Sequence, residues 1–342
     1  MRVLVTGGTG FIGQHLVRQL LREGYLVRCL VRDTAQAEAM FSPARELEFV
    51  SGDLTRPETL VGVANGVKHV FHLAAMGHVS AVSEEAFRQF VAVNVDGTAS
   101  LIRECGRAGV GKFIHFSSTA AMGLIKKSLV DETDVPQPRT PYQKSKYESE
   151  KTALILGKDL GVPTLVLRPC MVYGIGGTGE FFKMCRLMKK GFFPKVGSGR
   201  NLTPLVHVRD LVQAAMQTLY RGEAGQVYII ASARSLPMDE LRAMVMKAWG
   251  TRACYPYVPV WLMNVAAVGF ELLGRMTGKA PLATRQNIAS TVWDREFSIS
   301  KAANDLGYVQ SVDFAVGINE TVAWYKSQSS QANSLLDKHA CC

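Results

Sequence analysis

Tyr142 and Lys146 are the residues of this sequence whose types and spacing most directly suggest chemistry. They lie in the segment 140–146, where Thr140 is a good helix N-cap and Pro141 a good first helical residue. The predicted helix places the tyrosine and the lysine one turn apart on one face. A nearby ammonium lowers the pKa of a tyrosine, which is otherwise about 10. The pair therefore predicts an acid/base centre, the plain alternative being an exposed pair on a solvated helix.

Polar residues at two other places could complete such a centre. Ser117, Ser118 and Thr119 follow the apolar segment 113–116. We expect one of these hydroxyls to hydrogen-bond a substrate oxygen beside the tyrosine, unless they only cap a strand end. Asn94 falls inside a predicted helix, where asparagine is slightly unfavourable. It could bond a bulging backbone carbonyl, or a water that extends a proton relay.

A glycine-rich turn at the start of the chain predicts a dinucleotide site. The turn lies between the apolar segment 3–6 and an amphipathic segment. Such a turn lets the backbone approach a pyrophosphate, and the helix that follows adds N–H groups and a partial positive charge. Strand and helix stand where the motif requires them. The expected contacts are Gly7, Gly10, Phe11, Ile12 and Gly13.

The end of the second predicted strand indicates which nucleotide binds. Enzymes that use NAD place an acidic residue there to hold the ribose hydroxyls. Here Val31 takes that position and Arg32 follows, so a 2′-phosphate could pair with the guanidinium. We therefore expect NADP(H) in preference to NAD(H). Asp33 could still reach a ribose, and Arg32 could be an ordinary exposed charge.

Two further strand ends are candidate cofactor contacts. A carboxylate after the third strand can accept the adenine amino group, and small residues after the fourth strand let a dinucleotide lie against the backbone. Each could equally be a strand-end turn. The residues are Asp53, Leu54, Leu73, Ala74 and Ala75.

The elements that must position these residues alternate along the first 170 residues. Short apolar runs at 3–6, 26–31, 47–50, 67–73, 112–117 and 165–167 alternate with helical patterns such as 11–23 and 91–108. This alternation predicts an α/β fold, a Rossmann-type doubly wound parallel sheet with a smaller C-terminal substrate lobe. We place the nucleotide-binding domain at 1–170, the substrate lobe mainly at 171–327 with some segments returning to the sheet, and a flexible tail at 328–342.

Composition narrows the class of protein. The chain has 342 residues, 47% of them hydrophobic, and a net charge of +10. The basic residues are scattered, so we expect a phosphorylated small ligand and no nucleic acid. Seven cysteines without CxxC spacing suggest reduced thiols and no metal site. No signal peptide precedes MRVLVTGG, which favours a cytoplasmic location. The pair Cys341-Cys342 does not fit the usual prenylation form.

Taken in order, these motifs resemble the extended short-chain dehydrogenase/reductase family. That family shows TGxxGxxG, an Asp-Leu pair, HxAA, a helical Asn, a Ser or Thr, YxxxK and a later Arg-Pro. All of them occur here between Met1 and about Tyr325, the last as Arg168-Pro169. Their order and spacing are more specific than any single motif. The resemblance implies an NAD(P)-dependent oxidoreductase, with Pro169 at the cofactor.

The resemblance also implies roles for the candidate catalytic residues. Tyr142 would be the general acid/base, and Lys146 would activate it and bind the nicotinamide ribose. Asn94 would belong to the proton relay. Thr119 matches the catalytic hydroxyl by its place three residues after the strand's last phenylalanine, with Ser118 as its competitor.

Two substitutions argue against a nucleotide-sugar substrate. Epimerases and dehydratases of the family usually carry Asn where this chain has Met171, and a diphosphate-binding Arg where it has Thr203. A diphosphate needs paired donors, although Arg200 could partly compensate. The segments 197–202 and 258–273 instead resemble 3β-hydroxysteroid and sterol dehydrogenases. The segment 27–32 resembles dihydroflavonol reductases, which use NADPH.

We therefore expect an oxidoreductase that interconverts a hydroxyl and a ketone on a hydrophobic substrate, such as a sterol or a β-keto lipid. A nucleotide-sugar epimerase or dehydratase is the alternative, and a redox-inactive NADP-sensing protein is the second alternative. We also expect a homodimer. The apolar stretch Val258–Leu273 is too short to span a bilayer. We expect its apolar face to pack into the substrate lobe, the alternative being an apolar rim held on an anionic membrane surface.

Overall fold

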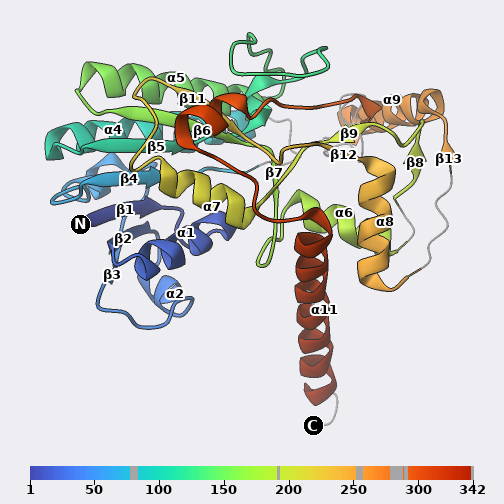
Figure 1. Ribbon diagram of the computed structural model, residues 1–342, viewed down its shortest axis with the longest axis horizontal. Coiled ribbons are helices and arrows are strands. Elements are labelled where there is room, and N and C mark those ends of the chain that lie inside the picture. The colour runs from blue at the N-terminus through green and yellow to red at the C-terminus, as the bar shows by residue number, and fades with distance from the viewer. Residues whose placement is uncertain (78–83, 191–192, 252–256, 278–287, 289–291, 340–342) are drawn as a thin grey trace.

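Seven parallel strands form the central sheet of the computed structural model, which describes residues 1–77, 84–190, 193–251, 257–277, 288 and 292–339 (Figure 1). They are β1 (Arg2–Thr6), β2 (Leu26–Val31), β3 (Leu47–Ser51), β4 (His69–His72), β5 (Lys112–Phe116), β6 (Thr164–Pro169) and β11 (Val227–Ile230). Their order is β11-β6-β5-β4-β1-β2-β3. The chain returns across β1 to form β4, which creates a topological switch point at the carboxyl ends of β1 and β4. The predicted doubly wound sheet is confirmed.

Helices cover both faces of this sheet, because every strand except β3 has consecutive buried residues that point to both sides. On one face, α1 (Phe11–Arg22) and α7 (Val208–Gln217) contribute Leu16, Leu20 and Leu211 to the core. On the other face, α4 (Gly97–Ala108) and α5 (Pro141–Asp159) contribute Leu101, Ile102, Cys105 and Ala153. The two faces together bury the sheet and fix the ends of its strands.

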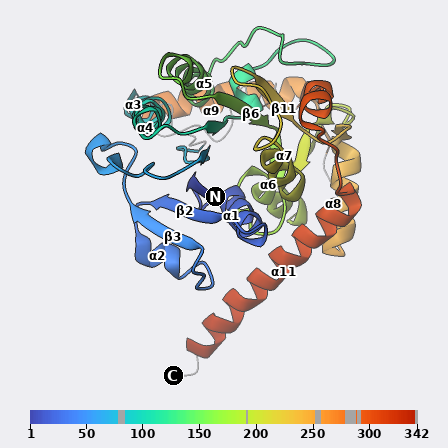
Figure 2. The same cartoon turned by 60° about the vertical axis from the view of Figure 1, so that its left-hand side comes forward.

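The second half of the chain supplies a smaller lobe beside the sheet (Figure 1). Its elements are β7 (Met171–Tyr173), α6 (Glu180–Lys189), β8 (Lys195–Val196), β9 (Leu202–Thr203), β10 (Leu205–His207), β12 (Leu236–Pro237), α8 (Met238–Trp249), β13 (Tyr257–Val258), α9 (Val260–Thr277) and α11 (Phe314–His339). Helices α6, α8 and the start of α11 share one apolar core. Helix α11 then projects away from the body, as Figure 2 shows. The tail that we predicted from residue 328 therefore begins inside a helix.

Short helices connect the larger elements. They are α2 (Thr34–Glu38), η1 (Pro57–Leu60), α3 (Glu84–Phe90), η2 (Val91–Asp96), η3 (Thr119–Met122) and η4 (Ala302–Leu306). The single helix that we predicted over 91–108 is a π-helical turn, η2, followed by α4. The wider turn presents Asn94 to the interior, where 2% of its surface is exposed.

The apolar face of α9 is exposed, so the expectation that it packs into the substrate lobe is wrong. Trp261, Val265 and Leu272 lie on this stripe with 67%, 61% and 53% of their surfaces exposed. Across the described part of the chain, no helix combines the length and the apolar character that crossing a bilayer needs. Cys341 and Cys342 lie outside the described residues.

Candidate active site

A capping box fixes the first turn of α5 and with it Tyr142. The Oγ1 atom of Thr140 accepts a hydrogen bond from the Gln143 backbone N–H at 3.2 Å, and Gln143 Oε1 accepts one from the Thr140 N–H at 3.1 Å. This reciprocal arrangement and Pro141 at the first helical position define where the helix starts. Tyr142 is therefore set by local sequence at the edge of the sheet where β5 ends.

Ser118, and not the predicted Thr119, is hydrogen-bonded to Tyr142. Ser118 has extended backbone angles and caps η3 by accepting a hydrogen bond from the Ala120 N–H at 3.1 Å. Thr119 is already the first residue of η3, and its hydroxyl is hydrogen-bonded to Cys170 instead. The hydroxyl that contacts Tyr142 is thus that of Ser118, which the sequence analysis gave as the competitor of Thr119. A serine followed by a tight turn is an N-cap signal that the sequence already contained.

Burial raises the pKa of Tyr142, and the hydrogen bond with Ser118 opposes this rise. The ring also packs near Phe90, with 5.9 Å between the ring centroids. Without a bound cofactor, the pKa of Tyr142 is therefore raised, and the expected lowering by Lys146 is wrong for this state. Tyr142 is therefore held as a neutral phenol, which carries the proton that a reduction needs but is a weaker acid than a free tyrosine.

Lys146 is buried beneath the tyrosine on the same helix. Its Nζ donates a hydrogen bond to the Phe116 carbonyl oxygen at 2.8 Å, which ties α5 to the end of β5. Burial lowers the pKa of Lys146 to about 8, and the negative charge of Glu150 opposes this shift. The ammonium is thus poorly solvated, and water screens its charge only weakly.

Asn94 joins three segments around the acid/base helix. Its Oδ1 accepts a hydrogen bond from the Met76 N–H at 2.7 Å, and its Nδ2 donates to the Met76 carbonyl at 3.3 Å and to Ser145 Oγ at 3.1 Å. The Ser145 hydroxyl in turn donates to the Tyr142 carbonyl oxygen at 2.9 Å. Asn94 therefore holds the segment after β4 against α5, through a side chain that also satisfies the Met76 backbone.

A buried ion pair that we did not predict lies behind the site. Arg168 NH2 and Glu150 Oε2 are 2.6 Å apart, and Arg168 Nε donates to Glu150 Oε1 at 3.0 Å. Ser117 also donates to Glu150, through a short hydrogen bond. The sequence signals were the Arg168-Pro169 motif and the position of Glu150, one turn after Lys146. This cluster fixes the positions of Ser117 and Arg168. Their chain neighbours are Ser118 and the cofactor candidate Pro169.

His72 organises the end of β4. Its two ring nitrogens are hydrogen-bonded to Thr6 Oγ1 at 2.7 Å and to Thr98 Oγ1 at 2.9 Å, and Thr6 Oγ1 also accepts from the Ala74 N–H at 3.1 Å. Burial lowers the pKa of His72 to about 3, so the ring is neutral. The segment Leu73–Ala75 is thereby held beside the end of β1.

The glycine turn forms a cradle that leaves no room for side chains. Gly7 has a φ of +70°, and a Cβ added there would lie 2.8 Å from the Ala74 nitrogen. A Cβ on Gly13 would lie 2.0 Å from the Gly7 carbonyl oxygen. Gly10 closes the turn by donating from its N–H to that oxygen at 3.0 Å. Phe11 and Ile12 follow, half-buried, in the first turn of α1. The cradle fits a dinucleotide pyrophosphate, because only backbone lines it.

The structure brings Arg32 and Asp53 together at the ends of β2 and β3. Arg32 is exposed, and Asp53 accepts hydrogen bonds from the Thr55 N–H and hydroxyl at 2.9 and 2.8 Å. These bonds lower the pKa of Asp53, and the charge of Arg32 adds to the effect. Asp33 caps α2 by accepting from the Gln36 N–H at 3.0 Å, which engages one oxygen of the competing carboxylate. The side chain of the candidate Leu54 is buried in the core.

Comparison with known proteins identifies the family. The model of the NAD dependent epimerase/dehydratase family matches residues 3–231, which include the glycine cradle, the acid/base helix and all seven strands of the sheet. The chain belongs to this family. Its members share the motifs by which we recognised an extended short-chain dehydrogenase/reductase, so that prediction is confirmed. The chain is an NAD(P)-dependent oxidoreductase.

Relatives within the family have different activities. A 3 beta-hydroxysteroid dehydrogenase/Delta 5-->4-isomerase of Mycobacterium tuberculosis is 32% identical, over 96% of this chain and 92% of the relative. A dTDP-glucose 4,6-dehydratase of Streptomyces niveus is 28% identical, over 95% and 93%. The solved dTDP-glucose 4,6-dehydratase DesIV of Streptomyces venezuelae, with NAD bound, is 28% identical with a TM-score of 0.77, over 97% and 98%. Family membership alone therefore leaves the substrate open.

Proposed function

We propose that this protein transfers hydride between NADP(H) and a hydroxyl/ketone pair on a hydrophobic substrate, such as a sterol or a β-keto lipid. The observation that carries the chemistry is the half-buried Tyr142, whose hydroxyl is hydrogen-bonded to Ser118. In the reductive direction Tyr142 donates a proton to the carbonyl oxygen, and Ser118 donates a hydrogen bond to the same oxygen. The nicotinamide supplies or accepts the hydride when bound. Lys146, one turn further along α5, would hold the nicotinamide ribose.

The hydrophobic substrate is supported by the residues that stand where a sugar nucleotide would need polar contacts. Thr203 lies in β9 and is buried, so it presents no cation to a diphosphate. Met171 is half-buried in β7 and offers no amide. Arg200, two residues before β9, is exposed. The 3 beta-hydroxysteroid dehydrogenase relative favours this assignment. The dTDP-glucose dehydratase relative keeps a nucleotide sugar as the second candidate.

The preference for NADP(H) rests on Arg32. Its exposed guanidinium stands at the end of β2, where an acidic residue would favour NAD. The neighbouring Asp33 carboxylate is engaged in capping α2. A 2′-phosphate at this edge would gain a charge-assisted hydrogen bond from Arg32.

A substrate panel tests the proposal. The protein would be incubated with NADPH and sterones or β-keto acids, and separately with NAD⁺ or NADP⁺ and dTDP-glucose or UDP-sugars, and cofactor turnover and product formation would be measured. We expect turnover of sterones or β-keto compounds only. Ser118→Ala should remove most of this activity, whereas Thr119→Val should keep it. Conversion of a nucleotide sugar alone would contradict the proposed substrate class.

We also propose that the exposed face of α9 contacts an anionic membrane surface. Trp261, Val265, Val268 and Leu272 form one apolar stripe. The sequence between 251 and 292 carries four basic residues and one acid, and the whole chain is basic. Co-sedimentation with anionic liposomes should exceed that with neutral liposomes and should fall with salt. Trp261→Asp should abolish the binding to anionic liposomes. Sedimentation that is the same with and without liposomes would refute the proposed membrane contact.

A homodimer remains a proposal as well. An apolar hollow at the end of α5 is lined by Leu154, Val162 and Pro163 together with the exposed Ile155. A second copy could cover this surface. Light scattering after gel filtration should give a mass twice that of one chain. Ile155→Asp should lower the measured mass toward that of a single chain. A monomer in the wild type would refute the proposal.

A further inference from the structure

His72 and two threonines form a chain of hydrogen bonds where β1 and β4 end. The Thr98 hydroxyl lies 2.6 Å from the Asn94 carbonyl oxygen and 2.9 Å from His72 Nε2. Because a carbonyl oxygen only accepts, the single hydroxyl hydrogen of Thr98 points to Asn94. The same hydroxyl oxygen must then accept from His72, so Nε2 carries the proton of the ring.

The other ring nitrogen of His72 is an acceptor. Burial, together with the charge of Lys146, lowers the pKa of His72 to about 3, so the ring is neutral and has one donor and one acceptor. Thr6 therefore donates to His72 Nδ1 at 2.7 Å, and the Thr6 oxygen accepts from the Ala74 N–H at 3.1 Å. The contacts thus fix a single direction of hydrogen bonds between Ala74 and Asn94.

The chain closes into a ring around the segment that follows β4. At one end of this segment the Ala74 N–H donates to Thr6, and at the other end the Met76 N–H donates to Asn94 Oδ1 at 2.7 Å. Ala74 faces the glycine cradle, since a Cβ added to Gly7 would lie 2.8 Å from the Ala74 nitrogen. One side of the ring therefore forms part of the predicted cofactor site.

The other side of the ring contacts the acid/base helix. Asn94 Nδ2 donates to Ser145 Oγ at 3.1 Å, and Ser145 Oγ donates to the Tyr142 carbonyl oxygen at 2.9 Å. Phe90, directly before the π turn that contains Asn94, packs near the Tyr142 ring. A shift of this turn would therefore move two residues that contact Tyr142.

The polar side chains of the ring are buried. Thr6 and Thr98 expose none of their surface, and His72 and Asn94 expose 1% and 2%. Polar groups in such a place cost free energy that apolar side chains of equal size would not, and a fully hydrogen-bonded network fixes one arrangement of its members. The network therefore specifies where the Asn94 amide lies.

We propose that His72 and Thr98 are positioning residues of the oxidoreductase. They hold the π turn so that the Asn94 amide keeps the first turn of α5, and with it Tyr142, in register with the cofactor segment Leu73–Ala75. The inference rests on the proposed function and deepens it, since it assigns the geometry of the acid/base centre to groups placed behind it. Loss of the Thr98 hydroxyl should therefore slow the reaction without weakening cofactor binding.

Thr98→Val tests the proposal, because valine has nearly the same shape and lacks the hydroxyl. NADPH oxidation would be followed with progesterone, a sterone, and with 3-oxodecanoate, a β-keto acid. We expect kcat to fall by about tenfold to a hundredfold, while the Kd for NADPH stays nearly unchanged. Thr98→Ser keeps a hydroxyl and should restore most of the wild-type kcat. In an Asn94→Ala background, Thr98→Val should cost little more, because the amide that Thr98 positions is already gone.

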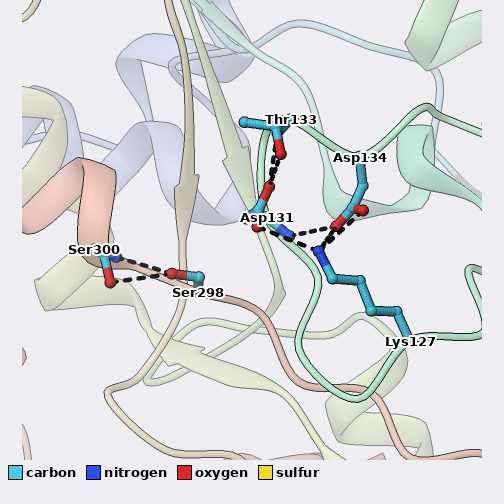
Figure 3. A network of polar contacts seen from close by, with 6 residues as sticks. All are labelled: Lys127, Asp131, Thr133, Asp134, Ser298 and Ser300. Atoms are coloured by element: carbon cyan, nitrogen blue, oxygen red, sulfur yellow. Dashed lines mark hydrogen bonds and ion pairs between the residues drawn. The ribbon is translucent and has the colours of Figure 1, made fainter.

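Thr133→Val is the matched control. Thr133 is exposed, and Figure 3 shows its hydroxyl hydrogen-bonded to Asp131 in a loop network with Lys127 and Asp134. The variant makes the same substitution in a network outside the ring, so kcat should keep its wild-type value.

Amide hydrogen exchange measured by NMR gives a readout that needs no turnover. With NADPH bound, exchange at Met76 should be faster in Thr98→Val than in the wild type, whereas Thr133→Val should leave it unchanged. Thr6→Val breaks the chain at its cofactor end and serves as the second variant if Thr98→Val does not fold. It should speed exchange at Ala74, whose N–H loses its acceptor, and should lower kcat as well.

A wild-type kcat in Thr98→Val, an equal loss in Thr133→Val, or a loss that multiplies fully with that of Asn94→Ala overturns the proposal. If the wild type reduces neither probe, the proposed hydride transfer to these substrates fails, and the positioning role is decided by exchange alone. Unchanged exchange at Met76 in Thr98→Val would then overturn the role, and faster exchange would support it.

Discussion

Replacing Glu150 by glutamine should strongly destabilise the protein. Glu150 and Arg168 have 2% and 4% of their surfaces exposed, and Arg168 donates three hydrogen bonds to the carboxylate. Removing one partner of a buried ion pair costs about 3–5 kcal/mol, because the other charge stays buried without compensation. Glutamine has nearly the same shape and can still accept from Ser117. The loss should therefore reflect charge, and we expect about 3 kcal/mol, the lower end of that range.

Glu148→Gln provides a matched control on the same helix. Glu148 pairs with Lys151 at 3.0 Å, but the two side chains are 52% and 46% exposed. Exposed pairs of this kind contribute less than about 1 kcal/mol. Urea denaturation followed by circular dichroism at pH 7 would give the free energy of unfolding of each variant. A difference between the two variants below about 1 kcal/mol would refute the argument from burial.

A second readout separates charge from packing. The charge of Glu150 raises the pKa of Lys146 against the effect of burial, so the pKa of about 8 should fall further in Glu150→Gln. The decline of kcat/KM that accompanies loss of the lysine proton should then begin at lower pH than in the wild type. Glu148→Gln should keep the wild-type profile. An unchanged profile in both variants would show that Glu150 does not act on Lys146.

Three further changes test the acid/base centre and the cofactor. Tyr142→Phe should lower kcat by about 10²–10⁴ while the Kd for NADPH stays nearly unchanged, and a wild-type kcat would reject the assignment. Arg32→Ala should remove most of the preference for NADPH over NADH in direct titrations, and equal Kd values in the wild type would contradict the proposal. Lys146 has a pKa of about 8 when folded and an ordinary value of 10.5, so the unfolded chain binds more protons between these values. Wild-type stability relative to Lys146→Met should thus rise by up to about 3 kcal/mol from pH 8 to 10.5 in urea titrations, and a constant difference would refute this.

The acid/base helix could be predicted because its determinants are local. Thr140, Pro141 and Gln143 define the start of α5 within four residues, and this start fixes Tyr142 and Lys146 on one face. Six of the seven strands of the sheet were predictable for a similar reason, since each contains a short apolar run, whereas β11 was not predicted as a strand. Their boundaries differ from the predicted ones by a few residues at most, as for β4, predicted over 67–73 and observed at His69–His72.

The remaining features depend on contacts between segments far apart in the sequence. Glu150 and Arg168 look like ordinary charges until α5 packs against β6. The choice between Ser118 and Thr119 depends on where η3 begins, which the motif match did not include. The exposure of α9 is likewise a tertiary property, because its apolar periodicity is the same whether a lobe covers that face or not.

The π-helical turn η2 makes this region sensitive to changes in length. A π turn corresponds to one residue inserted into an α-helix, so deleting one residue from 91–96 would restore an ordinary α-helical ladder. The flanking helices α3 and α4 would stay nearly in phase, because the π turn already absorbs the extra residue, but the wide turn that presents Asn94 to the interior would be lost. Asn94 would then leave Met76 and Ser145. In this segment a one-residue deletion should therefore be far more harmful than any conservative substitution, and alignments with relatives should place gaps outside it.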